Sequence, residues 1–295
     1  MKKSYIKYFT ALLLFGSNGI VASFIHLSSY EIVLLRTFIG SVLLIALFFL
    51  TRNKLTFYKH KKDSIFLTLS GIAMGTSWMF LYEAYAQIGV SIASLCYYCG
   101  PVIVMALSPI LFKEKLTAVK IIGFTAVLAG IFLVNGNAFD AGGNGWGIFC
   151  GLMSALMYAM MVICNKKARR IQGMESAALQ LFISFLTVFV FVLFKQGLAV
   201  HISTEDIIPM LILGLVNTGI GCYFYFSSIG KLPVQTVAIC GYLEPLSAVL
   251  FSVAFLHERL SLLQIVGAVC IIGGAVFSEL SSKRKLIGDD PVTKP

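Results

Sequence analysis

Charged residues are scarce in this sequence, and that scarcity argues against a soluble fold. Asp, Glu, Lys and Arg make up 12% of the 295 residues, whereas 58% are hydrophobic, and the mean hydropathy is +0.90. A soluble globule of this length needs more polar surface than such a composition supplies. We therefore expect the chain to lie in a lipid bilayer, with no room for a soluble domain.

Histidine is scarce as well, and its distribution argues against a catalytic or metal centre. The four histidines lie in or beside predicted loops on both faces: His26, His60, His201 and His257. A metal set or a His-based catalytic pair needs such residues close together. A Gly-rich nucleotide loop is also absent from the sequence. We therefore expect no enzyme activity, no catalytic residue, no bound metal and no cofactor.

Cysteine is absent from the predicted loops. The seven cysteines fall within apolar segments, at Cys96, Cys99, Cys150, Cys164, Cys222, Cys240 and Cys270. A free cysteine in such a segment behaves as a small hydrophobic residue. Cys96 and Cys99 have the Cys-x-x-Cys spacing, but loop cysteines and clustered histidines do not accompany them. We interpret the pair as packing rather than as a redox or metal site.

What the sequence does contain is an internal duplication. Residues 97–133 align without a gap with residues 241–277 when the numbers are offset by a constant. Identical pairs include Tyr98/Tyr242, Pro101/Pro245, Glu114/Glu258, Gly123/Gly267 and Gly130/Gly274. Each copy has an apolar run with a proline, a short charged hairpin and a second apolar run. The chain is therefore predicted to consist of two related units.

Apolar segments of roughly 20 residues, the length that crosses a hydrocarbon core as a helix, recur along the whole chain. They cover about residues 5–25, 31–50, 64–87, 90–112, 117–134, 145–164, 175–194, 207–228, 234–256 and 262–280. We predict an all-α integral membrane protein with ten transmembrane helices in two inverted five-helix repeats. The predicted units are residues 1–134, an extracytoplasmic connector 135–144, residues 145–280 and a polar cytoplasmic tail 281–295.

The basic residues predict the orientation. Short loops rich in Lys and Arg stay cytoplasmic, and an inner N-terminus places all 23 Lys and Arg residues on the inner side except Arg36, Lys195 and Arg259. Five spans in each half mean that the second half enters the membrane from the opposite side. Inverted repeats of this kind are typical of secondary transporters. We expect a plasma membrane protein with both termini cytoplasmic, whose net charge of +10 faces anionic lipid rather than nucleic acid.

An ionisable group inside a span is costly to insert, so each one is a candidate functional residue. Glu244 lies near the centre of the ninth span, directly before Pro245, which disfavours helix at the preceding residue. A carboxyl group beside a helix break suits a proton site or a substrate-cation site. The alternative is a protonated Glu that is hydrogen-bonded to a neighbouring helix.

Glu83 and Arg36 lie at similar depths toward the outer ends of their spans. Helical spacing places Glu83 on one face with Thr76 and Gln87, and this face is a candidate cavity wall. An ion pair between Arg36 and Glu83 would offset both charges, as an external gate or as a structural contact. Two alternatives stay open: Glu83 reaches water at the interface, and Arg36 extends its long stem outward.

Aromatic and amide side chains within the spans form a further group of candidates. They are Trp78, Tyr82, Tyr97, Tyr98, Tyr158, Tyr223, Tyr225, Tyr242, Asn18 and Asn217. Such a set can enclose a flat apolar body and hydrogen-bond its polar end. Because Tyr is also common at membrane interfaces without a ligand, the mid-span tyrosines carry this prediction. Pro101 and Pro245 are candidate hinges.

Three further glutamates, in or beside predicted loops, have structural interpretations. Ser28 precedes Glu31 by three residues just before an apolar run, which predicts a capping box at the start of a helix. Glu114 and Glu258 lie in loops beside basic residues. We expect a helix-turn role or a rim salt bridge for both.

The ten spans, the inverted duplication and the repeated hairpin resemble the EamA-type branch of the drug/metabolite transporter superfamily. The hairpins are Phe-Lys-Glu-Lys-Leu at 112–116 and Leu-His-Glu-Arg-Leu at 256–260, each after a mid-span proline. The resemblance covers about residues 5–280. It implies a substrate path between the halves, alternating access and export of small metabolites, often amino acids. Other members carry nucleotide sugars, vitamins, cofactors or quaternary amines, so the substrate does not follow from the fold.

Together these observations predict a secondary transporter for a small amphipathic metabolite, with an amino acid as the first choice of substrate. Glu244 is the expected titratable or cation-binding group and the tyrosines are the expected walls. The expected partners are the substrate, membrane lipids and protons as coupling ion, and the oligomeric state is left open. Uptake or exchange of a nucleoside, vitamin or amine is one alternative. A lipid or lipid-precursor scramblase or flippase is another, and it predicts a polar groove open to lipid.

Overall fold

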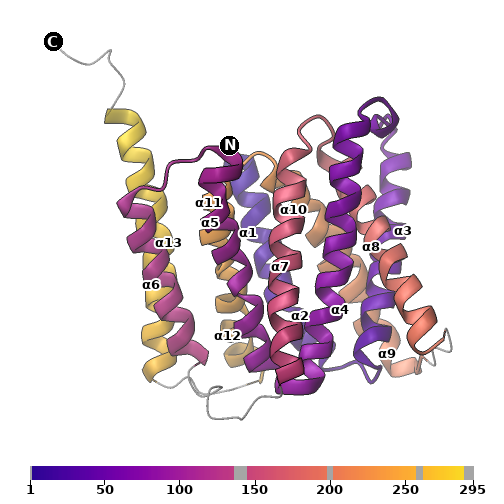
Figure 1. Ribbon diagram of the computed structural model, residues 1–295. Helices are drawn as coiled ribbons and strands as arrows, with labels where there is room; N and C mark the ends of the chain where they lie inside the picture. Colours follow the sequence, from indigo (N-terminus) through magenta and orange to yellow (C-terminus); the bar gives the residue numbers. More distant parts are fainter. Residues whose placement is uncertain (1, 136–144, 198–201, 257–261, 289–295) are drawn as a thin grey trace.

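The computed structural model describes residues 2–135, 145–197, 202–256 and 262–288, and over these residues the regular structure is helical. Figure 1 shows the helices standing side by side, with the start of α1 and the end of α13 on the same side of the molecule. The predicted all-α fold class is confirmed. The apolar composition explains it, because helices satisfy their own backbone hydrogen bonds in lipid.

The helices follow the predicted segments in order. The first half contains α1 (Lys2–Gly16), α2 (Asn18–Ala22), α3 (Ser29–Leu50), the 3-10 turn η1 (Phe57–Lys59), α4 (Lys61–Tyr97), α5 (Cys99–Phe112) and α6 (Ala118–Asn135). The second half contains α7 (Gly145–Lys167), α8 (Gly173–Lys195), α9 (Thr204–Leu211), the π-helix η3 (Ile212–Ile220), α10 (Gly221–Ile229), α11 (Val234–Gly241), α12 (Leu243–Leu256) and α13 (Leu262–Gly288).

Helix therefore occupies each of the ten predicted spans, although several are broken. Among the described residues, five segments are long and apolar enough to cross a membrane: Ser29–Leu50, Lys61–Ile88, Gly145–Lys167, Gly173–Lys195 and Thr204–Ile229. Shorter apolar helices are Cys99–Phe112, Ala118–Gly130 and Ile265–Phe277. The predicted capping box at the start of α3 is confirmed, since the Ser28 side chain accepts from the Glu31 backbone and Glu31 accepts from the Ser28 backbone.

One boundary differs from the prediction. The expected turn between residues 87 and 90 is helical, and α4 runs from Lys61 to Tyr97. The chain still reverses there, as its neighbours along α7 show. Gly151 and Ser154 are neighbours on α7, yet Gly151 lies against Cys96 and Ser154 against Ser77, and Gly147 lies against Ile88 between them in the sequence of α4. The reversing stretch has no proline and a single glycine, so helical hydrogen bonding continues through it.

The fourth and ninth spans break at equivalent places. The first break lies at Tyr98 between α4 and α5, and the second lies at Tyr242 between α11 and α12. Pro101 and Pro245 each occupy the third position of the helix that follows. A proline is tolerated there because the first turn of a helix has no partner for its N–H. Each candidate hinge proline therefore starts a new helical segment.

Glycines allow close contact between α6 and α13, the pair at one edge of the array in Figure 1. A Cβ atom added at Gly130 would lie 2.5 Å from the carbonyl oxygen of Gly267, and one at Gly274 would lie 2.5 Å from that of Gly123. Backbones approach this closely only where both helices carry small residues. The two contacts are related by the internal repeat.

The first hairpin glutamate joins the two halves. The Glu114 carboxylate accepts hydrogen bonds from the backbone N–H groups of Val234 at 2.8 Å and Gln235 at 3.2 Å. These groups begin α11 and have no partner within that helix. Glu114 thus caps a helix of the opposite half, a more specific role than the expected rim salt bridge. Its repeat mate, Glu258, lies outside the described residues.

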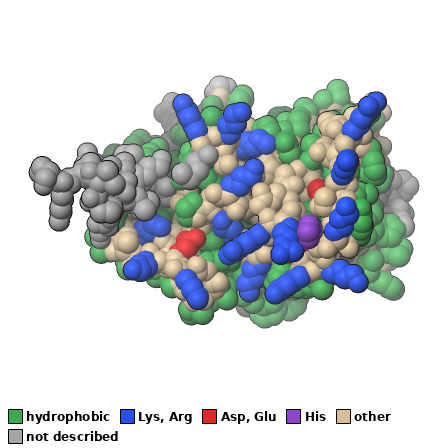
Figure 2. Space-filling model, turned by 90° about the horizontal axis from the view of Figure 1, so that it is seen from above, with side chains coloured by type: hydrophobic (Ala, Val, Ile, Leu, Met, Phe, Trp, Pro, Cys, Tyr) green, Lys and Arg blue, Asp and Glu red, His purple; other side chains and the backbone are tan. Residues whose placement is uncertain are grey.

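Basic side chains gather on one face. The α3–α4, α5–α6 and α7–α8 connections and the start of α1 lie at the same end of the helices (Figure 1). Seen from that end, Figure 2 shows many Lys and Arg side chains and few acidic ones. We call this end the basic face. Its exposure to the cytoplasm remains a prediction.

Candidate functional site

A central cavity lies between the two halves of the chain. Its larger part has a volume of about 490 Å³ and its narrower part about 50 Å³. Five residues line both parts: Phe15, Asn18, Trp78, Tyr97 and Glu244. They come from α1, α2, α4 and α12. The cavity therefore lies beside the break between α1 and α2 in the first span and the break between α11 and α12 in the ninth.

Most of the sequence-predicted residues surround this cavity. The structure places nine of them on its walls: Asn18, Arg36, Trp78, Tyr82, Tyr97, Tyr98, Tyr158, Tyr225 and Glu244. Glu83, Asn217, Tyr223 and Tyr242 are not among the lining residues. Arg36 and Glu244 are the charged residues of the larger part, one of each sign.

Glu244 is the second residue of α12, directly after the helix break at Tyr242. The break turns the start of α12 toward the cavity, so the carboxyl group lines both of its parts. Among the described residues, no hydrogen bond or ion pair engages this carboxyl group. The alternative of a carboxyl group bonded to a neighbouring helix therefore does not describe this arrangement.

Arg36 does not pair with Glu83, and that prediction is wrong. Arg36 is 3% exposed, and its Nε donates to Thr218 Oγ1 at 2.9 Å while an Nη donates to Asn18 Oδ1 at 3.4 Å. Its guanidinium carbon lies 4.8 Å from the Trp78 ring centroid, a cation–π distance. Trp78 and Glu83 are five residues apart on α4 and therefore point about 140° apart. The outward extension of Arg36 is excluded by the same burial.

The π-helix η3 holds Arg36 in place. Thr218 Oγ1, which accepts from Arg36, donates to the Leu213 carbonyl five residues earlier at 2.8 Å. Asn217 Nδ2 donates to Asn18 Oδ1 at 3.0 Å and to the Leu14 carbonyl at 2.9 Å. Asn217 thus supports the α1–α2 break from behind instead of lining the cavity. π-helical turns are frequent at functional sites because they displace side chains from the regular helical positions.

A tyrosine cluster closes the narrow part of the cavity. The hydroxyl groups of Tyr158 and Tyr225 lie 3.1 Å apart, and the rings of Tyr97 and Tyr158 are 5.4 Å apart in an edge-on arrangement. Tyr242 is fully buried behind them. Its position supports the wall of the cavity and leaves no contact with its interior.

The sequence model of the EamA-like transporter family matches residues 2–136 and again residues 145–280. The chain belongs to the EamA-like transporter family. This EamA-like protein is therefore a multi-pass membrane transporter, in keeping with its apolar helices.

Several relatives of this EamA-like protein are themselves named as transporters. It is 26% identical to the uncharacterized transporter YxxF of Bacillus subtilis (strain 168), over 95% of this chain and 90% of the relative. It is 25% identical to the uncharacterized transporter YoaV of the same organism, over 86% and 88%. It is 23% identical to the protein PecM of Dickeya dadantii (strain 3937), over 74% and 75%.

A crystal structure has the same fold. The match has a TM-score of 0.82 and covers 97% of this chain and 99% of the other, with 18% sequence identity. An identity this low supports the arrangement of helices alone. The family of this chain therefore rests on the sequence match, and the structural match supports the arrangement of its helices.

Glu83 of the EamA-like protein lies away from the central cavity. Its carboxylate forms an ion pair with Lys195 at 3.3 Å and accepts a hydrogen bond from Tyr30. These residues line a separate groove between α4, α7 and α8. The predicted face with Thr76 does line a cavity, but not the one that contains Arg36 and Glu244.

Sequence reasoning missed several walls of the cavity in this EamA-like protein. Apolar residues complete the narrow part, among them Phe15, Met74, Met161, Cys222 and Phe226. They carry no polar signal that separates them from residues facing lipid or packed helices. Among the described residues, no group of three or more His, Cys, Asp or Glu is arranged to hold a metal ion.

Proposed function

We propose that this EamA-like transporter exports a small zwitterionic metabolite with an apolar body, in the first instance an amino acid, by alternating access. The observation that carries the proposal is the charge pattern of the central cavity. Arg36 and Glu244 line its larger part, and neither has an ion-pair partner among the described residues. A solute that carries both charges can satisfy both groups at once.

The Arg36 guanidinium is suited to the carboxylate of such a solute. A guanidinium has five N–H donors in one plane, and the contacts with Thr218 and Asn18 use two of them. The other donors can bind a carboxylate through two parallel hydrogen bonds, a geometry that lysine does not reproduce. The contacts that hold Arg36 also preorganise its guanidinium for binding, because less side-chain freedom is then lost when the substrate binds.

Glu244 is suited to the ammonium group or to a proton. A carboxylate binds either one, but it cannot hold both at the same time. Proton binding from outside would then displace the substrate, and substrate binding from inside would displace the proton. This competition gives export in exchange for proton entry. The aromatic walls, among them Phe15, Trp78 and Tyr97, accept the apolar body of the solute.

The two helix breaks provide the moving parts. Tyr98 lines the cavity at the α4–α5 break, and Glu244 follows the α11–α12 break at Tyr242. Rocking of one half against the other about a central site is the usual motion of transporters with inverted repeats. The prolines at the start of α5 and α12 keep these breaks from closing into continuous helix.

The proposal is tested by ligand stabilisation and by flux. Detergent-purified protein is heated with neutral amino acids, with amines that lack the carboxylate and with carboxylic acids that lack the amine. A ligand of the native state raises the apparent melting temperature. We expect stabilisation by amino acids with apolar side chains and none by the two truncated sets. Proteoliposomes with an imposed pH gradient then test exchange.

The alternatives give different results in the same assays. Stabilisation by amines alone, with no effect of Arg36→Gln, would exclude the zwitterion proposal in favour of an amine substrate. Accumulation of the amino acid on the acidic side supports export in exchange for protons, whereas accumulation on the opposite side indicates uptake together with protons. A lipid scramblase would move a fluorescent lipid between leaflets without either response.

A further inference from the structure

The groove that contains Glu83 is a second site, independent of the central cavity. It has a volume of about 750 Å³, and none of the residues described as lining it lines the central cavity. Its walls come from α4, α7 and α8, with Tyr30 of α3 at one end. Phe194 is 85% exposed and Trp146 is 52% exposed. The groove therefore opens on the side of the bundle and not toward its centre.

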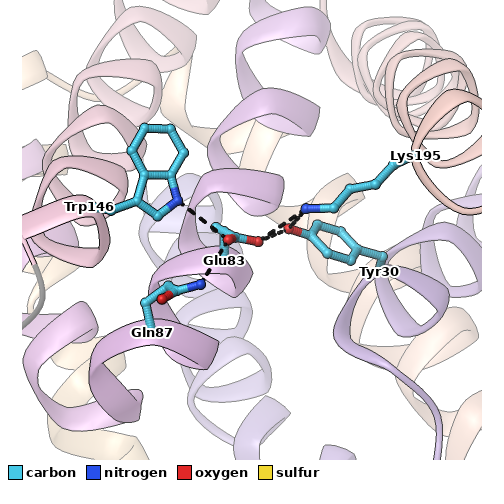
Figure 3. A network of polar contacts seen from close by, with 5 residues as sticks. All are labelled: Tyr30, Glu83, Gln87, Trp146 and Lys195. Atoms are coloured by element: carbon cyan, nitrogen blue, oxygen red, sulfur yellow. Dashed lines mark hydrogen bonds and ion pairs between the residues drawn. The ribbon is translucent and has the colours of Figure 1, made fainter.

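The polar groups of the groove gather at one end. Figure 3 shows the Glu83 carboxylate at the centre, with Lys195 and Tyr30 on one side and Trp146 and Gln87 on the other. Glu83 accepts from Gln87 Nε2 at 3.2 Å and from Trp146 Nε1 at 3.4 Å. It also accepts from Tyr30 and Lys195. Four donors occupy the carboxylate, so Glu83 positions its neighbours and is not itself open to a ligand.

Lys195 keeps capacity for a ligand. Its ammonium donates to Tyr30 at 2.9 Å and to Glu83 at 3.3 Å, and these contacts account for two of its three N–H groups. The side chain is 44% exposed. The ammonium lies 4.4 Å from the Tyr30 ring centroid and is held over it. One N–H of the exposed ammonium is therefore left to hydrogen-bond an anionic group at this end of the groove.

Below this end the groove is apolar. Met79, Phe80 and Val190 line it, and Thr187 directs its hydroxyl to the Ile183 carbonyl at 2.8 Å. Thr76 and Glu83, which both line the groove, lie seven residues apart on α4, so the groove extends about 10 Å along this helix. The polar end lies at the start of α3 and α7 and the end of α8, opposite the basic face. An apolar groove that ends at the membrane boundary in an exposed lysine, with one N–H left beside its ion pair with Glu83, suits a phospholipid.

We propose that this groove binds a phospholipid of the leaflet opposite the basic face, with its phosphate on Lys195 and one acyl chain along Val190, Phe194 and Met79. The remaining N–H of Lys195 donates to the phosphate, and the exposed aromatic wall packs against the acyl chain. The charged residues that line the groove, Glu83 and Lys195, lie at one end, and the rest of the described lining does not provide a charged path through the membrane. The lipid is bound and is not translocated. This inference does not depend on the substrate of the central cavity.

The two tryptophans make the test direct, since Trp78 lines the central cavity and Trp146 lines the groove. Trp78→Phe leaves Trp146 as the sole indole fluorophore, and Trp146→Phe leaves Trp78. Each variant of the full chain, in detergent, is titrated with phosphatidylglycerol that carries brominated acyl chains. We expect saturable quenching of Trp146 with a single lipid per chain, and little quenching of Trp78.

Substitutions in the Trp78→Phe background separate a site from general contact with lipid. Lys195→Gln removes the charge-assisted hydrogen bond and is expected to weaken lipid binding roughly tenfold, whereas Lys195→Arg retains binding. Phe194→Ala is expected to weaken lipid binding because it removes a contact with the acyl chain. Lys167→Gln, at the opposite end of α7, serves as the matched control and leaves binding unchanged. Thermal unfolding verifies that each variant is folded.

Three outcomes would overturn the proposal. Quenching that rises without saturation and is equal in Lys195→Gln indicates general contact with the micelle. Competition by glycerol 1-phosphate as strong as that by the lipid indicates a site for soluble phosphate. A change in Trp146 fluorescence that follows protein concentration and not lipid indicates that a second copy of the chain covers the groove.

Discussion

The phenol of Tyr242 donates a hydrogen bond to the backbone carbonyl of Tyr98 at 2.7 Å. These two residues are each other's mates in the internal repeat, and each marks the helix break of its own half. A carbonyl at a helix end lacks its intrahelical partner, and the phenol supplies one. The bond therefore links the two helix breaks, so that movement at one break is transmitted to the other.

Loss of this bond should cost stability and slow the transport cycle. We expect Tyr242→Phe to lower the free energy of unfolding by about 1 kcal/mol, because a buried carbonyl loses its partner. Tyr58→Phe on the exposed turn η1 is the matched control. Thermal unfolding in detergent measures the difference. Equal stability of the two variants would show that the Tyr242 bond contributes nothing.

Arg36 should determine recognition of the substrate carboxylate. We expect Arg36→Lys and Arg36→Gln to weaken amino acid binding at least roughly tenfold, because neither reproduces the bidentate guanidinium contact. Calorimetric titration of the purified protein gives the Kd. Arg169→Gln, on the exposed α7–α8 connection, is the control. Unchanged affinity in a folded Arg36→Gln variant would place the carboxylate elsewhere.

Glu244 should confer the pH dependence of binding. As the pH falls the carboxyl group takes up a proton, and its attraction for the substrate ammonium group is lost. We therefore expect amino acid affinity in the native protein to fall with falling pH, and affinity in Glu244→Gln to be low and independent of pH. Titrations at several pH values measure both. Transport that stays pH-dependent in a normally folded Glu244→Gln variant would remove this residue as the coupling group.

The glycine contact between α6 and α13 predicts a contrast between neighbouring residues. Gly274→Ala forces the helices apart and is expected to destabilise the protein by about 1–3 kcal/mol. A Cβ atom at Gly273 meets nothing within 4 Å, so Gly273→Ala should be neutral or slightly stabilising, since Ala favours helix. Thermal unfolding of the pair decides the matter. Similar melting temperatures would mean that the two helices separate at no cost.

The sequence was sufficient for the helices, the repeat and the breaks in the fourth and ninth spans, but not for the rotation of each helix about its axis. The proline at 101 and its mate at 245 marked the breaks, and the Ser28–Glu31 spacing marked a cap. Rotation is a different problem, because a span that is apolar all round fits lipid and packed helices equally well. For this reason the sequence does not show that Arg36 faces Trp78 instead of Glu83.

The π-helix and the continuity of α4 were also beyond sequence reasoning. Besides the bond from Thr218 to Leu213 within η3, Thr218 and Asn217 contact Arg36 and Leu14 of the other half of the chain. These contacts between distant segments are not visible in the local sequence. The reversal within α4 lacks the polar turn residues from which turns are normally predicted. In both places packing against a distant segment determines the local backbone.

The contacts between the halves have the form of an isologous dimer interface. Gly130 meets Gly267 while Gly123 meets Gly274, so each residue and its mate exchange roles, as in a two-fold symmetric pair of separate subunits. Association at such an interface needs no covalent link between the partners. The two halves, translated as separate chains and co-expressed, should therefore assemble into one particle. Failure to co-purify would show that the covalent connection is required for assembly.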